Sequence, residues 1–145
     1  MAIRRVGVIA LLVAGGFLGA GYLGEKPTVG GGFTSDASAT VFDAFTSKRS
    51  GVWVNARGKV TRLLPDDKDG SRHQRFIVAF ENGRTVLISH NIDLAHRLPL
   101  RSGDAVSLRG RYEYNDRGGV IHWTHHDPGG GLEGGWIEHA GQRYR

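Results

Sequence analysis

Residues 73–90, with the sequence HQRFIVAFENGRTVLISH, decide the fold. β-branched and aromatic residues concentrate in residues 73–80 and again in residues 85–90, which is typical of β-strands. Between these runs lies Asn82-Gly83, the residue pair that a tight hairpin turn prefers because its central positions need positive φ. The stretch therefore predicts two antiparallel strands joined by a hairpin.

The chain on both sides of this hairpin continues the β pattern. From Val52 the apolar or small residues fall at even positions as far as Val60, which is the period of a half-buried strand. Three further strands are expected at residues 52–63, 105–114 and 120–125, with turns at 65–71 and 115–119. The predicted domain thus contains five strands.

A short helical link is expected between the third and fourth strands. Asp93 could cap one helical turn within residues 91–99, and Pro99 would end it. A long bent first strand, a hairpin, a helical link and a closing hairpin follow the order of a five-stranded Greek-key barrel of the OB type. Gly58 suits the bend that the first strand of such a barrel needs. The predicted fold class is therefore all-β, a small OB-like barrel; a small open sandwich would leave the same pattern.

The N-terminal segment differs in kind from the rest of the chain. After Arg4 and Arg5, residues 6–24 carry no charge and are long enough to span a bilayer core. The two arginines would stay on the cytoplasmic side, so the domain is expected on the outer side, anchored to the inner membrane or secreted to the periplasm. Residues 1–24 are interpreted as a signal peptide or a retained, helical membrane anchor, and both interpretations stay open.

A tether is predicted between this segment and the domain. Residues 25–50 are rich in Gly, Ser and Thr, and the spacing of Val41, Phe42 and Phe45 predicts a short helix at residues 40–47. The β domain is assigned to residues 51–145.

Composition limits the chemistry of the domain. The chain has 145 residues, no cysteine and a formal charge of +5, so thiol catalysis, disulfides and zinc-thiolate sites are excluded. A metal would need His, Asp or Glu ligands. The positive charge favours an anionic ligand, an envelope protein or, with weaker support, nucleic acid as a partner besides the membrane.

A dense polar cluster lies near the end of the chain, at residues 122–127, with His139 following a glycine loop. The tentative metal ligands are His125, His126, Asp127 and His139. Imidazoles and a carboxylate suit zinc or another divalent ion, although the spacing matches no zinc signature. The alternative is a network at the end of a strand, in which imidazole N–H groups bond to backbone carbonyls and Asp127 caps a turn.

A second polar group lies at the end of the third strand. In an OB barrel this point could approach the fifth strand, which would combine the two groups into one site. The candidates for that polar binding site are His90, Asn91, Asp93, His122, Trp123 and Thr124. A His–Asp pair could orient a general base, whereas the alternative is that Asn91 and Asp93 only cap a helical turn.

Arginines interleave with aromatic residues along the predicted strands, a mixture that could follow a single nucleic-acid strand by charge and stacking. On a strand, however, arginine faces water while aromatic residues face the core. We therefore expect the two sets to remain apart.

Several strings in the chain are similar to one bacterial family. They are residues 90–95, the Ser102-Gly103-Asp104 turn, residues 110–115, and above all Gly119-Val-Ile-His-Trp-Thr-His-His-Asp-Pro128. Over residues 51–144 the chain resembles the family of unknown function number 3465. That resemblance implies a small exported protein with a compact domain, and it implies no activity, cofactor or catalytic residue.

Three functions follow as hypotheses. The first is an exported envelope module that binds a ligand or partner through the polar site. The second is a metal-dependent hydrolase, acting for example on phosphodiesters, that uses the His/Asp cluster. The third is a structural interaction protein of the envelope.

Overall fold

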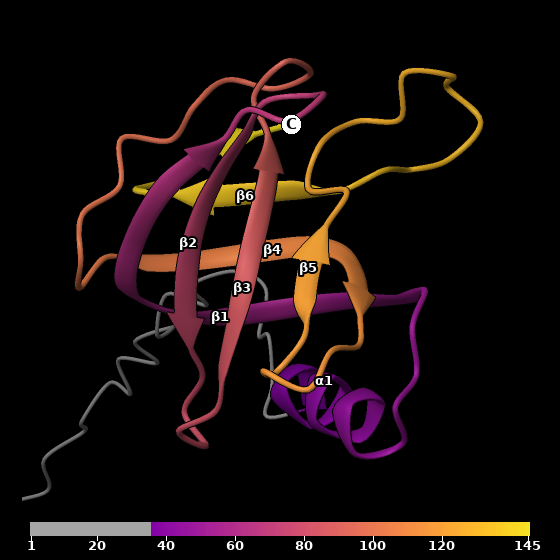
Figure 1. The fold of residues 1–145 in the computed structure, drawn as a ribbon. Helices are drawn as coiled ribbons and strands as arrows, with labels where there is room; N and C mark the ends of the chain where they lie inside the picture. Colours follow the sequence, from indigo (N-terminus) through magenta and orange to yellow (C-terminus); the bar gives the residue numbers. More distant parts are fainter. Residues whose placement is uncertain (1–35) are drawn as a thin grey trace, which may run out of the picture. The chain divides into compact units, whose positions relative to one another are not determined.

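The computed structural model describes residues 36–145, which fold around one β-sheet (Figure 1). The predicted signal or anchor segment and the first part of the tether lie outside the described residues. Within residues 36–145, no helix is long and apolar enough to cross a membrane.

The hairpin at the centre of the sequence is confirmed. Strand β2 (His73–Ala79) pairs antiparallel with β3 (Thr85–Asn91), and side chains along both strands alternate between buried and half-buried positions. Gly83 has a φ of 78° in the turn, as the Asn-Gly pair predicts.

Strand β1 (Val52–Asp67) is long and pairs with two other strands. Its first half pairs with β4 (Ala105–Glu113) and its second half with β2. The strand passes from β4 to β2 at Gly58 and Lys59, and Figure 1 shows that β1 is bent. A Cβ atom at Gly58 would lie 2.5 Å from the carbonyl oxygen of Ala79, so only glycine allows β2 to approach this closely.

The expected turn after this strand begins later than predicted. β1 continues through Pro65 to Asp67, and its pairing register with β2 shifts between Leu64 and Asp67. At such an irregularity proline, which has no N–H, costs no ladder hydrogen bond.

The sheet closes into a barrel. β5 (Val120–His122) pairs parallel with β3 and antiparallel with β4, and β4 returns to β1, giving the ring β1-β2-β3-β5-β4. This five-stranded ring is the predicted OB-like arrangement.

Strand β5 is shorter than predicted, and two strands follow it that were not predicted. Trp123 has a φ of 54°, so the extended conformation stops at His122 rather than continuing to His125. β6 (Trp136–His139) then pairs with β4, and β7 (Gln142–Tyr144) pairs with β6, extending the sheet beyond the ring (Figure 1).

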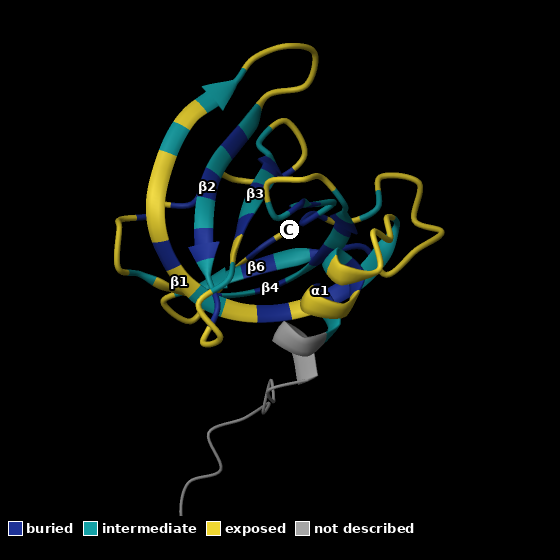
Figure 2. Cartoon of the chain, turned by 60° about the horizontal axis from the view of Figure 1, so that its bottom comes forward, coloured by how far each residue is buried: buried dark blue, intermediate teal, exposed yellow. Residues whose placement is uncertain are grey.

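Helix α1 (Asp36–Thr46) precedes the barrel and begins four residues before the predicted helix. Its Val41 and Ala44 are buried with the barrel core, while Phe42, Asp43 and Thr46 are exposed. Figure 2 shows the exposed stretches of the helix in yellow. The core itself includes Phe76, Ile88, Leu98, Leu108, Tyr112, Ile121 and Ile137, all nearly inaccessible to solvent.

The predicted helical link after β3 is one hydrogen-bonded turn. The N–H of Ala95 donates to the carbonyl of Asn91 at 3.1 Å, and the chain then runs irregularly to β4. The side-chain oxygen of Asn91, and not that of Asp93, caps this turn by accepting from the N–H groups of Asp93 and Leu94.

Candidate functional site

The predicted approach of the third strand to the segment after the fifth occurs at His90 and Thr124. Both side chains are fully buried, and the Thr124 hydroxyl lies 2.8 Å from Nδ1 of His90. The other ring nitrogen, Nε2, lies 3.2 Å from the carbonyl oxygen of His96. A neutral imidazole satisfies both contacts if Nε2–H donates to that carbonyl and Nδ1 accepts from Thr124.

Electrostatics keep this imidazole neutral. Burial, which removes the charged form from water, lowers the pKa of His90 to about 4. His90 is therefore a buried structural link between β3 and the chain beyond β5, with no solvent-facing nitrogen.

His125 is also a buried, neutral residue. Its Nδ1–H donates to the carbonyl of His126 at 2.7 Å, and burial lowers its pKa. Its own carbonyl accepts from the N–H of Gly135 at 2.7 Å, which closes the loop of residues 126–134 onto the barrel.

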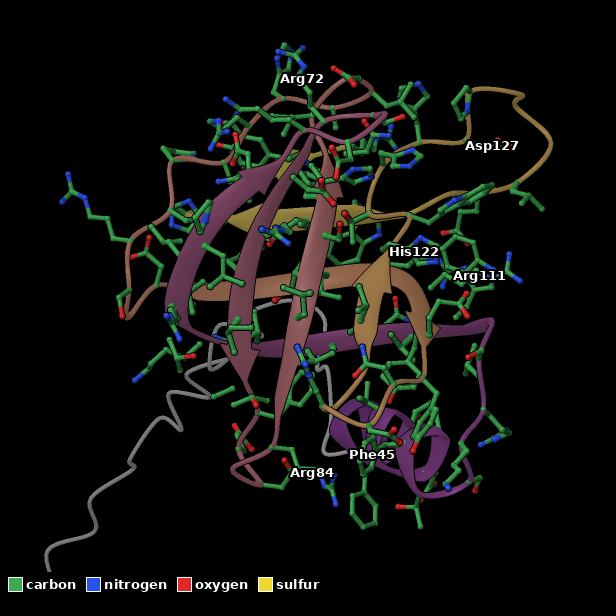
Figure 3. The ribbon with its side chains drawn as sticks, viewed as in Figure 1. Phe45, Arg72, Arg84, Arg111, His122 and Asp127 are labelled. Atoms are coloured by element: carbon green, nitrogen blue, oxygen red, sulfur yellow. The ribbon has the colours of Figure 1, made fainter. Side chains whose placement is uncertain are left out.

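Asp127 organises that loop from within. Its carboxylate accepts from the N–H groups of Gly129, Gly131 and Leu132 at 2.8–3.2 Å. These hydrogen bonds lower the pKa of Asp127. Figure 3 shows Asp127 within the curve of the projecting loop. This matches the predicted alternative in which Asp127 caps a turn.

The partner of Asp93 is Arg72 rather than His90. Its carboxylate accepts from the backbone N–H and from Nε of Arg72, both at 2.7 Å, and these contacts lower its pKa. Asp93 and Asn91 therefore fix the turn after β3 rather than orienting His90 as a general base.

The four tentative metal ligands do not gather around one centre. Nε2 of His139 pairs with a carboxylate oxygen of Asp104 at 3.0 Å. The carboxylate of Asp127 instead accepts hydrogen bonds from backbone N–H groups of its own loop. In the described part of the chain, no three His, Asp or Glu side chains are placed to hold a metal ion. The structure therefore does not bring His125, His126, Asp127 and His139 together at the bend after β5.

A different surface emerges on the outside of the barrel. Residues that lie directly opposite in paired strands share a face of the sheet. Two rows cross β4 in this way: Trp53–Arg111–His122 and Asn55–Arg109–Trp136. Figure 3 shows Arg111 and His122 next to each other on this side. We call the set of Trp53, Arg109, Arg111, His122, Trp123, Trp136 and Arg143 the tryptophan–arginine face.

Indole rings and guanidinium groups are in contact across this face. The Cζ atom of Arg109 lies 5.0 Å from the ring centroid of Trp53, and the rings of Trp53 and Trp123 meet edge to face at 6.2 Å. Arg143 lies over Trp136 at 4.1 Å. Such contacts are cation–π interactions and fix the guanidinium groups at the surface.

Carboxylates balance much of the charge here. The partners are Glu133 for Arg109 at 3.3 Å, Glu113 for Arg111 at 3.7 Å and Glu138 for Arg143 at 3.2 Å. Nε2 of His122 also lies 3.3 Å from Glu113. The side chain of Glu133 is 76% exposed, so its ion pair with Arg109 contributes little stability.

The sequence-based expectation that arginine and aromatic side chains stay apart is right for Phe76 and Tyr112, which are buried. It is wrong for Trp53. The alternation that puts Val54 and Ala56 in the core puts Trp53 outside, and that signal was present in the sequence. The register with β4, which places Trp53 beside the outward arginines, was not.

Comparison with known families identifies the chain. The family model described as Protein of unknown function (DUF3465) matches residues 30–145, so the chain belongs to this family. The matched region includes α1 as well as the barrel. No curated protein gives a significant match to the chain.

Proposed function

We propose that this member of the DUF3465 family is an exported binding module of the cell envelope that holds an anionic ligand on its tryptophan–arginine face. The observation that carries the proposal is the placement of Arg109 over Trp53 and of Arg143 over Trp136. Guanidinium groups fixed in this way lose little further conformational freedom when they bind a carboxylate or a phosphate.

Binding would exchange one carboxylate partner for another. In the free protein Glu133 and Glu138 neutralise Arg109 and Arg143. A ligand bearing several anionic groups can displace both exposed carboxylates and gain charge-assisted hydrogen bonds from the arginines. The three indole rings add apolar and stacking contact to this exchange.

The polar residues favour a binding module over a hydrolase. His90 has both ring nitrogens within hydrogen-bonding distance of protein groups, and His125 donates to the backbone from a buried position. These two imidazoles support the barrel and the loop after β5, which favours a structural role for them over a catalytic one.

The proposed location rests on the sequence. The uncharged run of residues 6–24 after Arg4 and Arg5 supports export with the domain on the outer side of the membrane, either anchored or released. A ligand on that side would be an acidic envelope polymer or an acidic surface of an envelope protein.

Tryptophan fluorescence tests the proposal directly, because all three tryptophans of the chain belong to the face. The full chain in dodecyl maltoside is titrated with polygalacturonate and with a short oligothymidylate, which offer carboxylates and phosphates. We expect a saturable emission change with at least one polymer, weakened by added salt.

A matched pair of variants makes the test specific. R109Q/R143Q should weaken binding about tenfold, since each exposed charge contact contributes up to about 1 kcal/mol. R62Q/R101Q removes the same charge from exposed positions outside the face and should have a much smaller effect. Equal losses in the two variants, or no saturable response to either polymer, would overturn the proposal.

A further inference from the structure

We propose a second binding site, for a small anion attached to an apolar or aromatic group, in a surface cavity where β1 bends. The cavity has a volume of about 450 Å³ and is lined by Arg57, Lys59, Ala79, Phe80, Glu81 and Ala105, with Gly58 at the bend. It shares no residue with the tryptophan–arginine face, so it stands independently of the function proposed above.

The pairing of the strands explains why a cavity exists at this place. Lys59 is the residue of β1 that pairs on both edges, with Ala79 of β2 on one side and Ala105 of β4 on the other. Residues directly opposite one another share a face of the sheet, so two methyl groups flank the long side chain of Lys59. The small neighbours leave an open hollow beside it.

The charge of the cavity favours an anion. Arg57 and Lys59 are two residues apart on β1 and therefore project from the same outer side, and both are exposed. Within residues 36–145, neither is in an ion pair with a carboxylate. Of the lining residues Glu81 alone is acidic, so the cavity has a net positive charge.

The remaining wall is apolar. Ala79 and Ala105 line the cavity with their methyl groups. Phe80 also borders it, but the residue is only 5% exposed because it packs in the barrel core. A ligand that combines a phosphate or carboxylate with a ring would place the anion at Arg57 and Lys59 and the ring along this wall. A phosphate monoester of an aromatic alcohol and an aromatic carboxylate share this chemistry.

Amide NMR shift mapping on the full chain in dodecyl maltoside tests the site with phenyl phosphate, benzoate and inorganic phosphate. We expect saturable shifts at Gly58, Lys59 and Ala105 in the millimolar range, with inorganic phosphate weaker than phenyl phosphate. Comparison of phenyl phosphate with benzoate identifies which anion the site prefers. Equal affinity for inorganic and phenyl phosphate would overturn the role of the apolar wall.

Substitutions at exposed positions sharpen the test without threatening the fold. R57Q and K59Q should each weaken phenyl phosphate binding about fivefold, whereas E81Q should tighten it, because it removes a repelling charge. R62Q removes the same charge from β1 outside the cavity and serves as the control. A105L should weaken binding with no change of charge by filling the hollow.

The proposal is overturned if phenyl phosphate produces no saturable shift at the cavity, or if R62Q weakens binding as much as R57Q. Indole N–H signals recorded in the same spectra distinguish binding in this cavity from binding at the tryptophan–arginine face. They should stay unchanged during the phenyl phosphate titration, and loss of polymer binding at that face would leave the cavity result intact.

Discussion

Nδ1 of His90 lies 2.8 Å from the hydroxyl oxygen of Thr124, which joins the end of β3 to the chain just beyond β5. The two residues are 34 positions apart in sequence, and neither is exposed to solvent. This contact therefore couples the closure of the barrel to the protonation state of one imidazole.

Stability should fall in mildly acidic solution because of His90. Its pKa is lowered from 6.5 to about 4 in the folded protein, so its contribution is complete above pH 6.5 and is lost as the pH falls toward 4. Each pKa unit corresponds to about 1.4 kcal/mol, so we expect a loss of about 3 kcal/mol across this window. Burial shifts the pKa of His125 in the same direction and adds to the effect.

Urea unfolding at several pH values measures this dependence. H90Q should flatten the pH profile, because it removes the buried imidazole whose pKa is lowered. The carboxylates of Asp93 and Asp127 have lowered pKa values, and their contributions are lost only below this window. A wild-type profile that is flat between pH 6.5 and 4 would contradict the account.

Removing the Thr124 hydroxyl should leave His90 without its partner. T124V keeps the shape of the side chain and should cost about 1 to 3 kcal/mol of unfolding free energy, because a buried acceptor is left unsatisfied. T124S retains the hydroxyl and should preserve the hydrogen bond. The ¹⁵N chemical shift of Nδ1 in His90 distinguishes the two, and equal shifts in both variants would argue against the bond.

Gly135 is expected to tolerate no side chain. A Cβ atom there would collide with the carbonyl oxygen of Trp123 and lie 2.5 Å from that of Arg109, both of them backbone atoms. G135A should therefore destabilise the fold by about 3 kcal/mol through overpacking. G129A, in the same loop, meets only the Asp127 carboxylate at 3.6 Å and is the control. Thermal unfolding compares the two variants, and equal melting temperatures for G135A and G129A would contradict the steric argument.

Arg84 should hold α1 on the barrel. Its Cζ atom lies 4.5 Å from the ring centroid of Phe42 and 4.7 Å from that of Phe45, and Figure 3 shows Arg84 near Phe45 below the barrel. R84Q removes both contacts, so we expect faster amide hydrogen exchange in α1 while exchange in the core strands stays unchanged. R117Q, in the exposed turn after β4, is the matched control. Unchanged exchange in α1 would refute this role.

The parts of the fold that the sequence could predict are those with local signals. The hairpin turn at Asn82-Gly83 and the alternation of Val54, Ala56 and Val60 are read directly from neighbouring residues. The five-stranded ring followed from the order of these elements.

The parts that were missed depend on long-range pairing. β6 has four residues and β7 three, too few for a periodic signal. β6 forms because β4 offers an edge to pair with, and β7 in turn pairs with β6. The early end of β5 depends on the positive φ of Trp123, which no local pattern indicated.

The site was predicted only in part, for the same reason. The order of the strands predicted that the end of the third strand approaches the fifth, and His90 does contact Thr124. The sequence alone did not reveal that both residues are buried, which makes them inaccessible to a ligand. It also missed the contact of Arg109 with Trp53, which depends on the register between β1 and β4.

The most direct test of the proposed function follows the three indole N–H signals of Trp53, Trp123 and Trp136 in ¹H–¹⁵N NMR spectra of the full chain. The titrant is whichever anionic polymer binds more tightly in the fluorescence assay. The account predicts that all three signals shift together and saturate, along with the amides of Arg109 and Arg111. Unchanged indole signals, with shifts confined to the outer side of β2 and β3, would contradict it.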